Sequence, residues 1–349
     1  MSTQTVNLSL LNLTDWPVMA GAVVVALGVD FWLGEPRARW HPVVWMGHYL
    51  SAAGQYMAPK VIPKVSTQAS RPVNEFCRGV LGWSLGALLV LVLAAVASGF
   101  VLKLSQQLPW LHMLFLGVLL KLMLAWRMLR DEVLAVEQTL AESLDSGRNR
   151  VSWLVSRDVS TLNATQVREA ALSTLAENLN DSVLAPLFWF AVAGLPGAAL
   201  YRFANTADAM WGYPGENQER QWAWAGKWTA RVDDVLSWIP ARLTAFLLGL
   251  PILWRGMSKV MYNAGLPPSP NGGWPMAALA LRLGIRLGKS GVYQLNPQGR
   301  ACLPADTDMA LRACGQVVAL LAGGAIWVVI MAMVGGALGS PFARTSWGV

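Results

Sequence analysis

Two long uncharged apolar segments constrain this chain more than any other feature of its sequence. Residues 79–102 and 315–343 contain no Asp, Glu, Lys or Arg over 24 and 29 positions, and a helix needs about 20 apolar residues to cross a bilayer. Only 13% of the 349 residues are charged, against about 25% in an ordinary soluble domain. The chain is therefore predicted to be an all-α, polytopic integral membrane protein that forms one domain over residues 1–349.

Four apolar stretches are predicted to be clear transmembrane helices within this helical bundle. Lys121 lies close enough to the end of the third stretch for its ammonium group to reach the membrane surface by snorkelling. The four stretches are residues 16–34, 79–102, 104–126 and 315–340.

Two further apolar stretches, 182–201 and 235–254, are predicted to be broken or re-entrant helices. Pro196 interrupts the first within a Leu-Pro-Gly turn sequence, while Pro240 and Arg242 lie near the middle of the second. Proline removes a helical hydrogen bond, and a charge at the centre of a span costs about 2.5–3.5 kcal/mol. Irregular backbone at membrane depth is tolerated where it lines a cavity, which is what a functional site would provide.

Lysine and arginine counts predict which connections face the cytoplasm. Six lie in residues 37–78, six in 127–182 and seven in 255–314, against one in 103–120. Cytoplasmic connections carry the excess of positive charge, so the three richer connections are predicted to be cytoplasmic. The connection 202–233 contains four, and we expect both broken stretches to fold back so that it lies on the same side.

The overall charge and the pattern of Cys and His argue against several classes of function. The 27 Lys and Arg residues outnumber the 20 Asp and Glu residues, which suits anionic lipid or an anionic substrate, and no separate basic arm indicates nucleic acid. Three cysteines and three histidines form no CxxC or HxxxH pattern, so neither zinc nor a disulfide framework is expected. Since no Lys or Arg precedes Arg37, the first apolar stretch is interpreted as a retained anchor.

Two prolines hold a pair of basic residues close to the end of the first span. Arg37 follows Pro36, and His41 precedes Pro42. Proline restricts the backbone, which would keep both basic side chains near the membrane surface as an anion-binding pair. The alternative is an ordinary positively charged flank of a membrane span.

A second group of candidate residues lies where a predicted helix enters the stretch 182–201. Asn163 can cap this helix with Gln166 three residues later, and apolar residues then recur at helical spacing. Near the end of the helix, Glu177 and Asp181 are four residues apart and therefore share one helix face.

The carboxylates of Glu177 and Asp181, together with the Asn178 amide, suit a magnesium ion. In phosphate chemistry Mg²⁺ is commonly held by one or two carboxylates plus substrate oxygens. The alternatives are a solvated helix face, or ion pairs with Arg157 or Arg168. Position matters, because carboxylates that abut a membrane are costly unless they have partners.

Two more acidic clusters lie at the boundaries of apolar stretches. Asn205 and Asp208 follow the fourth stretch, and Arg231, Asp233 and Asp234 precede the fifth. Acids grouped with Asn and Arg at such boundaries indicate either a buried polar site or structural ion pairs. In the first case, Asp208 would join the two carboxylates above as a metal ligand.

A loop rich in proline and glycine, residues 267–275, is the last candidate. Its turns would expose backbone N–H groups to a polar ligand, with Ser269, Asn271 and Trp274 as contacting side chains. The alternative is a plain connector. The segment 284–290 is one residue short of the GxxxxGK[ST] phosphate loop and has no strand signal before it, so it is not interpreted as one.

Taken together, these blocks resemble the CobD/CbiB family, the membrane-bound adenosylcobinamide-phosphate synthases of cobalamin biosynthesis. The blocks follow the family's order from Asp30 to Pro275, which chance explains poorly. They are Asp30, Glu35-Pro36-Arg37, His41-Pro42-Val43, Arg157-Asp158, Ala176-Glu177-Asn178-Leu179 with Asp181, Ala185-Pro186-Leu187-Phe188, Asn205-Thr206 with Asp208, Arg231-Val232-Asp233-Asp234, Trp238-Ile239-Pro240-Ala241-Arg242, and Pro268-Ser269-Pro270-Asn271 with Gly273-Trp274-Pro275.

The resemblance implies an amide ligation. The family joins (R)-1-amino-2-propanol, or its O-2-phosphate, to the free propionate carboxylate of adenosylcobyric acid, giving adenosylcobinamide or its phosphate. A carboxylate resists attack by an amine because oxide would have to leave, so ATP and Mg²⁺ are expected to activate it. A bacterial inner-membrane location with mainly cytoplasmic polar loops is also expected, and a complex with other late cobalamin-pathway enzymes is left open.

On this basis, four residues are assigned to catalysis and nine to substrate binding. The catalytic residues are Glu177, Asn178, Asp181 and Asp208, of which the three carboxylates would hold Mg²⁺. The substrate-binding residues are Arg37, His41, Asn205, Arg231, Asp233, Asp234, Ser269, Asn271 and Trp274.

Two functions of other classes stay open. A membrane carrier for a corrinoid or another anionic solute would need ionisable residues well inside its spans, and only Arg242 and Asp30 fit that pattern. A non-catalytic corrinoid-binding paralogue would not need the acidic clusters together. The chain departs from residues common in the family at Glu35, Ser173, Thr174, Ser182, Pro267 and Met276.

Overall fold

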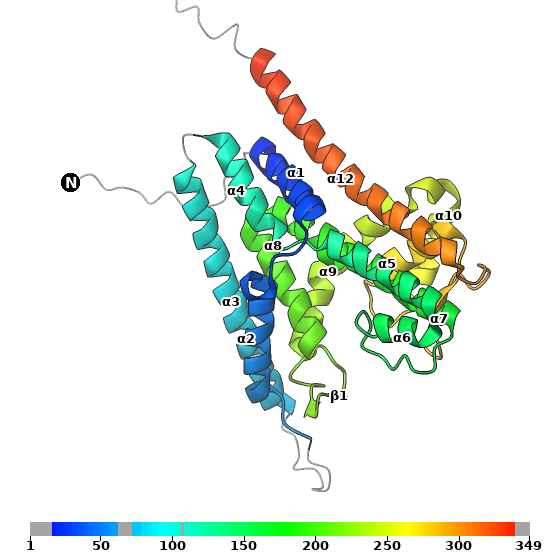
Figure 1. The fold of residues 1–349 in the computed structure, drawn as a ribbon. Helices are drawn as coiled ribbons and strands as arrows, with labels where there is room; N and C mark the ends of the chain where they lie inside the picture. The colour runs from blue at the N-terminus through cyan, green and yellow to red at the C-terminus, as the bar shows by residue number, and fades with distance from the viewer. Residues whose placement is uncertain (1–15, 62–71, 106–107, 339–349) are drawn as a thin grey trace, which may run out of the picture.

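The computed structural model describes residues 16–61, 72–105 and 108–338, and this part of the chain is almost entirely helical (Figure 1). Its α-helices are α1 (Trp16–Leu33), α2 (Pro42–Met57), α3 (Pro72–Leu104), α4 (Pro109–Lys121), α5 (Trp126–Glu142), α6 (Leu144–Val151), α7 (Ala164–Leu179), α8 (Ala185–Trp211), α9 (Lys227–Gly249), α10 (Leu253–Ala264), α11 (Gly273–Leu283) and α12 (Pro304–Leu338). Short helical turns are η1 (Ala38–Trp40), η2 (Asn180–Leu184) and η3 (Leu250–Ile252), and two antiparallel hairpins pair β1 (Glu216–Asn217) with β2 (Arg220–Gln221) and β3 (Leu287–Lys289) with β4 (Tyr293–Leu295).

Six helical segments of the described chain are long and apolar enough to cross a membrane, which confirms the predicted polytopic helical membrane protein. Exposed apolar side chains cover much of α3 from Leu81 to Leu104 and of α12 from Leu320 to Val334, as expected of helices that face lipid. Figure 1 shows the later half of α12 standing apart from the other helices. The six segments are Trp16–Leu33, Pro72–Leu104, Pro109–Glu142, Ala164–Trp211, Lys227–Ile252 and Pro304–Gly335.

The third predicted span is not one straight helix. α4 has 13 residues, about 20 Å at 1.5 Å per residue, and the chain turns at residues 122–125 before α5 begins at Trp126. The prediction that Lys121 snorkels to the membrane surface is wrong. Its ammonium is buried, 3.0 Å from Asp30 Oδ1 and 2.8 Å from Glu35 Oε1, because these carboxylates offer it partners inside the protein.

The fourth apolar stretch is broken, as the sequence predicts. η2 is a π-helical turn between α7 and α8. Within α8, Ala193 and Gly194 leave helical geometry next to Pro196, and Gly194 has a φ of +63°, a backbone conformation that glycine adopts far more easily than other residues. The later half of α8 carries Tyr201 to Asp208 toward the candidate site.

The fifth stretch is continuous through Pro240, where a break was expected. Proline cannot donate to the carbonyl four residues earlier, but that carbonyl, on Leu236, accepts a hydrogen bond from Trp189 Nε1 at 2.9 Å. The indole of α8 thus replaces the missing bond and α9 continues to Gly249. The chain leaves α-helical geometry at the next proline, Pro251, within η3.

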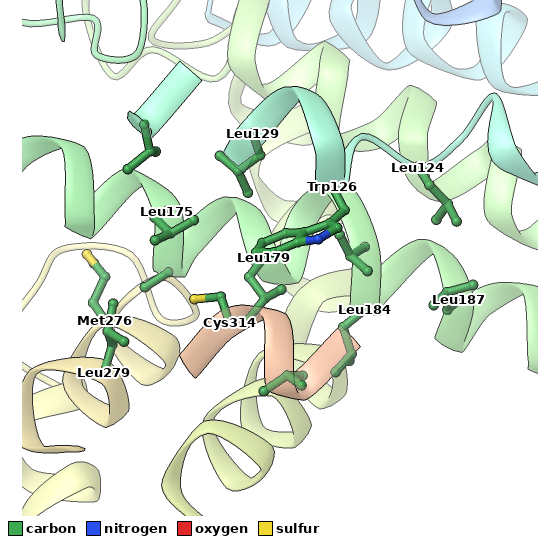
Figure 2. Packing of buried hydrophobic residues seen from close by; sticks show 14 of the residues in the cluster. Leu124, Trp126, Leu129, Leu175, Leu179, Leu184, Leu187, Met276, Leu279 and Cys314 are labelled. Atoms are coloured by element: carbon green, nitrogen blue, oxygen red, sulfur yellow. The ribbon is translucent and has the colours of Figure 1, made fainter. Parts of the chain in front are cut away.

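α7 is buried on most of its surface and lies at the centre of the core near the site. Asn163 and Gln166 form the predicted capping box at its start. A helix that is covered on most sides needs apolar or small residues around its circumference, and residues 170–176 of α7 are all buried. Figure 2 shows Leu175 and Leu179 of α7 in one buried cluster with Trp126, Leu129, Met276, Leu279 and Cys314 of α5, α11 and α12.

The connection between α8 and α9 lies against the segment that follows α2. Val61 N donates to the Glu219 carbonyl at 2.8 Å, and Gln221 N donates to the Pro59 carbonyl at 3.0 Å. Arg220 Nη1 adds a bond of 2.6 Å to the Ala58 carbonyl. The two connections therefore lie at the same end of the helices. This arrangement agrees with the prediction that the connection 202–233 lies on the same side as residues 37–78.

Candidate functional site

Asp181 is held by three hydrogen bonds in the π-helical turn between α7 and α8. Its Oδ1 accepts from Asn180 Nδ2 at 2.8 Å and from the Tyr201 hydroxyl at 3.2 Å. Its Oδ2 accepts from Asn205 Nδ2 at 3.2 Å. A carboxylate has about four lone-pair positions, so Asp181 is fixed in orientation and still has one acceptor position for a ligand.

Three more carboxylates surround Asp181, and together they form what we call the carboxylate cluster: Glu177, Asp181, Asp208 and Asp233. Glu177 interacts electrostatically with Asp181 and Asp208, and Asp233 interacts with the same two residues. Asp233 Oδ1 is buried without a hydrogen-bond partner in the described part of the chain. Like charges this close destabilise one another unless a cation or a cationic ligand compensates them. The structure thus brings the three acidic clusters of the sequence together.

Glu177 lies against the start of α11. A Cβ built on Gly272 would lie 2.6 Å from Glu177 Oε1, so glycine leaves the room that this carboxylate occupies. Gly272 directly precedes α11, and the N–H groups at the start of a helix favour a nearby negative charge. Asn178, assigned to catalysis from the sequence, turns back to its own helix and donates to the Thr174 carbonyl at 3.1 Å.

Asp234 and Arg231 lie at the edge of the carboxylate cluster. Asp234 interacts electrostatically with Asp208 and with Arg231. Arg231 is exposed, whereas Asp234 is partly buried. This arginine is therefore accessible to an anionic ligand that approaches the cluster from solvent.

The loop 267–272 is docked on α9 through side chains that the sequence assigned to substrate. Ser269 Oγ accepts from the backbone N–H of Asn271 at 3.2 Å and of the following residue at 3.1 Å. Asn271 Oδ1 accepts from Arg242 Nη1 at 2.7 Å. The Arg242 guanidinium lies between the rings of Trp238 and Trp274, 4.4 and 4.7 Å from their centres. Sequence reasoning noted the charge of Arg242 but missed that it anchors this loop.

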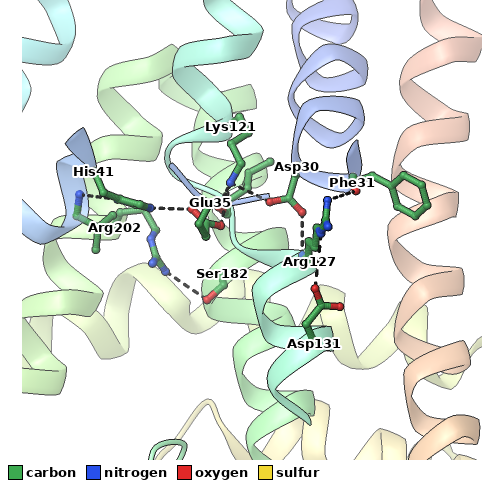
Figure 3. A network of polar contacts seen from close by, with 11 residues as sticks. Asp30, Phe31, Glu35, His41, Lys121, Arg127, Asp131, Ser182 and Arg202 are labelled. Carbon is green, nitrogen blue, oxygen red and sulfur yellow. Dashed lines mark hydrogen bonds and ion pairs between the residues drawn. The ribbon is translucent and has the colours of Figure 1, made fainter. Parts of the chain in front are cut away.

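The structure gives the two members of the predicted anion-binding pair, Arg37 and His41, different surroundings. His41 Nε2 is 2.8 Å from Glu35 Oε2, and its Nδ1 accepts from Val43 N at 3.2 Å at the start of α2 (Figure 3). Burial raises the pKa of Glu35, but hydrogen bonds from His41 and Lys121 outweigh it and hold the pKa below its ordinary value. Arg37 is exposed beside this network.

Arg202 connects this network with the carboxylate cluster, and the sequence analysis missed it. Its Nη1 donates to the Asp181 carbonyl at 3.0 Å and to Ser182 Oγ at 3.4 Å (Figure 3). The guanidinium also interacts electrostatically with Glu35. The signal that could have found it is a lone arginine directly after an apolar stretch, three residues before Asn205.

The ion pairs proposed as an alternative use for Glu177 are made elsewhere. Arg168 forms a bidentate pair with Glu137 of α5, at 2.7 and 2.8 Å. Arg157 interacts electrostatically with Glu169. Neither arginine is paired with the carboxylate cluster, whose electrostatic partners include Arg202 at Asp181.

Magnesium fits the carboxylate cluster by the chemistry of the donors. Within residues 16–61, 72–105 and 108–338, no group of three His, Cys, Asp or Glu side chains is spaced as a ready-made metal site. Mg²⁺ commonly takes only one or two carboxylates and completes its shell with water and substrate oxygens. The unpartnered Asp233 Oδ1 and the crowded carboxylates are features that a cation would satisfy. The three predicted ligands Glu177, Asp181 and Asp208 are not spaced to hold one ion together, so one or two of them with substrate oxygens would make up the site.

Comparison with known proteins gives the family. The CobD/Cbib protein family model matches residues 23–321, which contain the whole carboxylate cluster. The chain belongs to the CobD/CbiB family. A role in cobalamin biosynthesis follows from this membership. No solved structure matches the chain.

Similar proteins from archaea and bacteria cover most of the chain. The probable cobalamin biosynthesis protein CobD of Methanothermobacter thermautotrophicus is 38% identical over 304 residues, 83% of this chain and 90% of that protein. The cobalamin biosynthesis protein CobD of Rhodobacter capsulatus is 38% identical over 286 residues, 78% and 83% of the two chains. Its counterpart in Stutzerimonas stutzeri is 37% identical over 315 residues, 89% and 96% of the two chains.

Proposed function

We propose that this protein is an ATP-dependent amide ligase that joins (R)-1-amino-2-propanol, or its O-2-phosphate, to the free propionate carboxylate of adenosylcobyric acid. The carboxylate cluster is the observation that carries the proposal. Four carboxylates from four consecutive helical elements, α7, η2, α8 and α9, with Asp181 fixed by neutral donors, suit a reaction that handles phosphoryl charge through Mg²⁺. Family membership supports the choice of corrinoid substrate.

The residues of the site divide between holding charge and moving a proton. ATP supplies the leaving group that the propionate oxygen lacks. Glu177, Asp181 and Asp208 would hold Mg²⁺ against its phosphoryl oxygens, and Arg231 would contact phosphate from the exposed edge. Amide formation releases a proton from the attacking amine, and Asp233, whose Oδ1 has no partner in the described chain, would accept it.

The remaining assigned residues would act mainly by positioning. Ser269, Asn271 and Trp274 hold the loop beside Glu177 through the contacts described above, and Asn205 orients Asp181. His41 holds Glu35. Arg37 lies at an exposed edge of the site, and Asp234 lies at a partly buried edge. We further propose that the polar loops lie on the cytoplasmic side of a bacterial inner membrane, where ATP is available, and that other late cobalamin-pathway enzymes can assemble there.

A direct assay tests this function. Detergent-purified protein is incubated with adenosylcobyric acid, MgATP and either the free or the phosphorylated amine, and the corrinoid is followed by mass spectrometry. The expected result is a mass gain equal to the amine minus water that requires ATP. No gain with either amine from folded protein would contradict the proposal, and corrinoid binding without reaction would favour the non-catalytic paralogue or the carrier.

A further inference from the structure

A polar cavity of about 660 Å³ lies between the first half of α7 and the hairpin β3–β4. Gln166 and Glu169 line it from α7, and Arg286, Lys289 and Tyr293 line it from the hairpin and the residue before it. None of the residues assigned to the proposed function lines this cavity. Its volume is sufficient for a small substrate or a large part of a nucleotide.

Positive charges outnumber negative charges around this cavity. Arg286 and Arg157 both interact electrostatically with Glu169, and Lys289 is exposed at the hairpin. The Nε atoms of Arg157 and Arg286 are buried and have no hydrogen-bond partner among the described residues. A buried guanidinium N–H without an acceptor is costly, so both arginines favour a ligand that brings oxygen acceptors.

The tip of the hairpin adds backbone donors beside the cavity. Val292 N donates to the Lys289 carbonyl at 2.9 Å, which closes the turn, and Gly291 has a φ of +72°. In the part of the chain that the structure describes, the N–H groups of Ser290 and Gly291 donate to no acceptor. Successive free N–H groups in a turn of this kind bind anions. The segment 284–290 thus leads into and forms the first strand of a β-hairpin rather than a phosphate loop, but it gathers similar donors.

Tyr293 connects the cavity with the carboxylate cluster. Its side chain lines the cavity, and its hydroxyl donates to Met276 Sδ at 3.7 Å. It interacts electrostatically with both Glu177 and Arg157. An anion bound in the cavity would therefore have Tyr293 as a neighbour in common with Glu177, one of the carboxylates predicted to hold Mg²⁺.

We propose that this cavity is an anion site that binds the phosphate groups of a substrate through Arg286, Lys289 and the turn at Ser290. Arg157 does not line the cavity and adds positive charge through its interaction with Glu169. The ligand is a phosphate ester or polyphosphate, which ATP and the amine phosphate both provide. The identity of these two ligands rests on the proposed function, whereas the anion site rests on the cavity and its charges.

Binding measurements on variants of the full chain test the site. The purified protein in detergent is titrated calorimetrically with a non-hydrolysable ATP analogue, with 1-amino-2-propanol O-2-phosphate and with inorganic phosphate. Arg286→Gln and Lys289→Met are each expected to weaken binding of the phosphate ligand about tenfold or more, because each removes a charged hydrogen-bond donor. Glu169→Gln is expected to strengthen binding, because it removes the negative charge that competes with phosphate.

Two matched controls separate a local effect from a change in total charge. Arg312→Gln and Lys259→Met remove exposed charges from α12 and α10 and are expected to leave binding unchanged. Lys289 is exposed, so its variant reports on the site even if Arg286→Gln does not fold.

The outcomes distinguish the site from the proposed function. Weakened binding of the ATP analogue alone assigns the cavity to the nucleotide, and weakened binding of the amine phosphate alone assigns it to the amine. The site is overturned if both variants bind every ligand as tightly as wild type does, or if wild type binds none of the ligands. Amide formation is assayed in the same preparation. If the wild-type protein forms the amide but the variants bind the phosphate ligands as tightly as wild type, only the site is overturned. If the variants bind the ligands more weakly but the wild-type protein forms no amide, only the proposed function is overturned.

Discussion

At the residue scale, Arg202 joins two polar networks that are separate in the sequence. It donates to the Asp181 carbonyl and interacts with Glu35, which itself pairs with Lys121. The Ser182 carbonyl also accepts from the backbone N–H of Ala125, at 3.0 Å. The turn that carries Asp181 is therefore fixed from both sides, which is how a site keeps its carboxylates in place despite their repulsion.

The substitution Asp181→Asn tests the role of the carboxylate cluster. It keeps the size of the side chain but removes the charge, so we expect amide formation to fall about 100-fold or more, the scale of losing a group that stabilises developing charge. Membrane insertion should be unchanged. Product formation is followed by mass spectrometry and folding by thermal unfolding in detergent.

Asp145→Asn is the matched control for that variant, because Asp145 is 86% exposed and pairs with the neighbouring Arg148. It should retain wild-type activity. Undiminished product formation by folded Asp181→Asn protein would sink the metal-site hypothesis.

Glu35 predicts a dependence of stability on pH. Because its pKa in the folded protein lies below the ordinary value of 4.5, its contribution to the free energy of unfolding is complete above that value and is lost as the pH falls through the folded-state pKa. The midpoint of thermal unfolding should therefore decrease as the pH falls below 4.5.

The substitution Glu35→Gln should lower the stability at neutral pH. It should also make the midpoint of thermal unfolding fall less steeply as the pH decreases below 4.5. Glu142→Gln, at an exposed position at the end of α5, should leave the profile as in wild type. If the unfolding midpoint of Glu35→Gln falls with pH as steeply as that of wild type, other carboxylates cause the loss of stability in acid.

At the element scale, the sequence predicts the helices better than their breaks. The first span and the capping box at Asn163 depend on local patterns, and the structure confirms both. The expected break at Pro240 fails because Trp189 of another helix supplies the missing hydrogen bond. Lys121 was misplaced for the same reason, since its partner Asp30 lies on a different helix.

The candidate site shows the same division between local and long-range information. Acidic residues at apolar boundaries could be found from the sequence, and α7, α8 and α9 bring them together. The contact of Asn271 with Arg242, and the link through Arg202, could not be found because they depend on how the helices pack. Side chains that looked free for a ligand in the loop 267–272 are used to hold the loop.

The start of α11 gives a prediction about the position of Glu177. In Gly272→Ala the new methyl group would meet Glu177 Oε1, and the end of that side chain must move. We expect amide formation to fall about tenfold, with little change in unfolding temperature, because displacing a group by about 1 Å costs rate more than stability.

Gly265→Ala provides the comparison for Gly272→Ala. A Cβ at Gly265 would have no contact closer than 3.8 Å, so this variant should keep wild-type activity. Equal loss of activity in both variants would point to a general effect of added side chains near α10 and α11 rather than to Glu177.

At the scale of the whole molecule, the contact between two distant connections constrains the topology in the membrane. The hairpin β1–β2 bonds to the segment after α2 through Val61 and Gln221, so we predict that both lie on the same side of a bilayer. The count of basic residues predicts that this side is the cytoplasm and that the connection between α3 and α4, with one Lys, is on the other. Each half of this statement can be tested without reference to activity.

Labelling of single cysteines in intact cells makes that test. In a background with Cys77, Cys302 and Cys314 replaced, Glu216→Cys and Tyr56→Cys, both at exposed positions, should resist a membrane-impermeant thiol reagent until the cells are opened. Leu108→Cys, exposed at the start of α4, should react from outside. Reaction of the first two together from outside would reverse the predicted orientation but keep the contact, whereas opposite behaviour of those two positions would contradict the packing of β1–β2 against the end of α2.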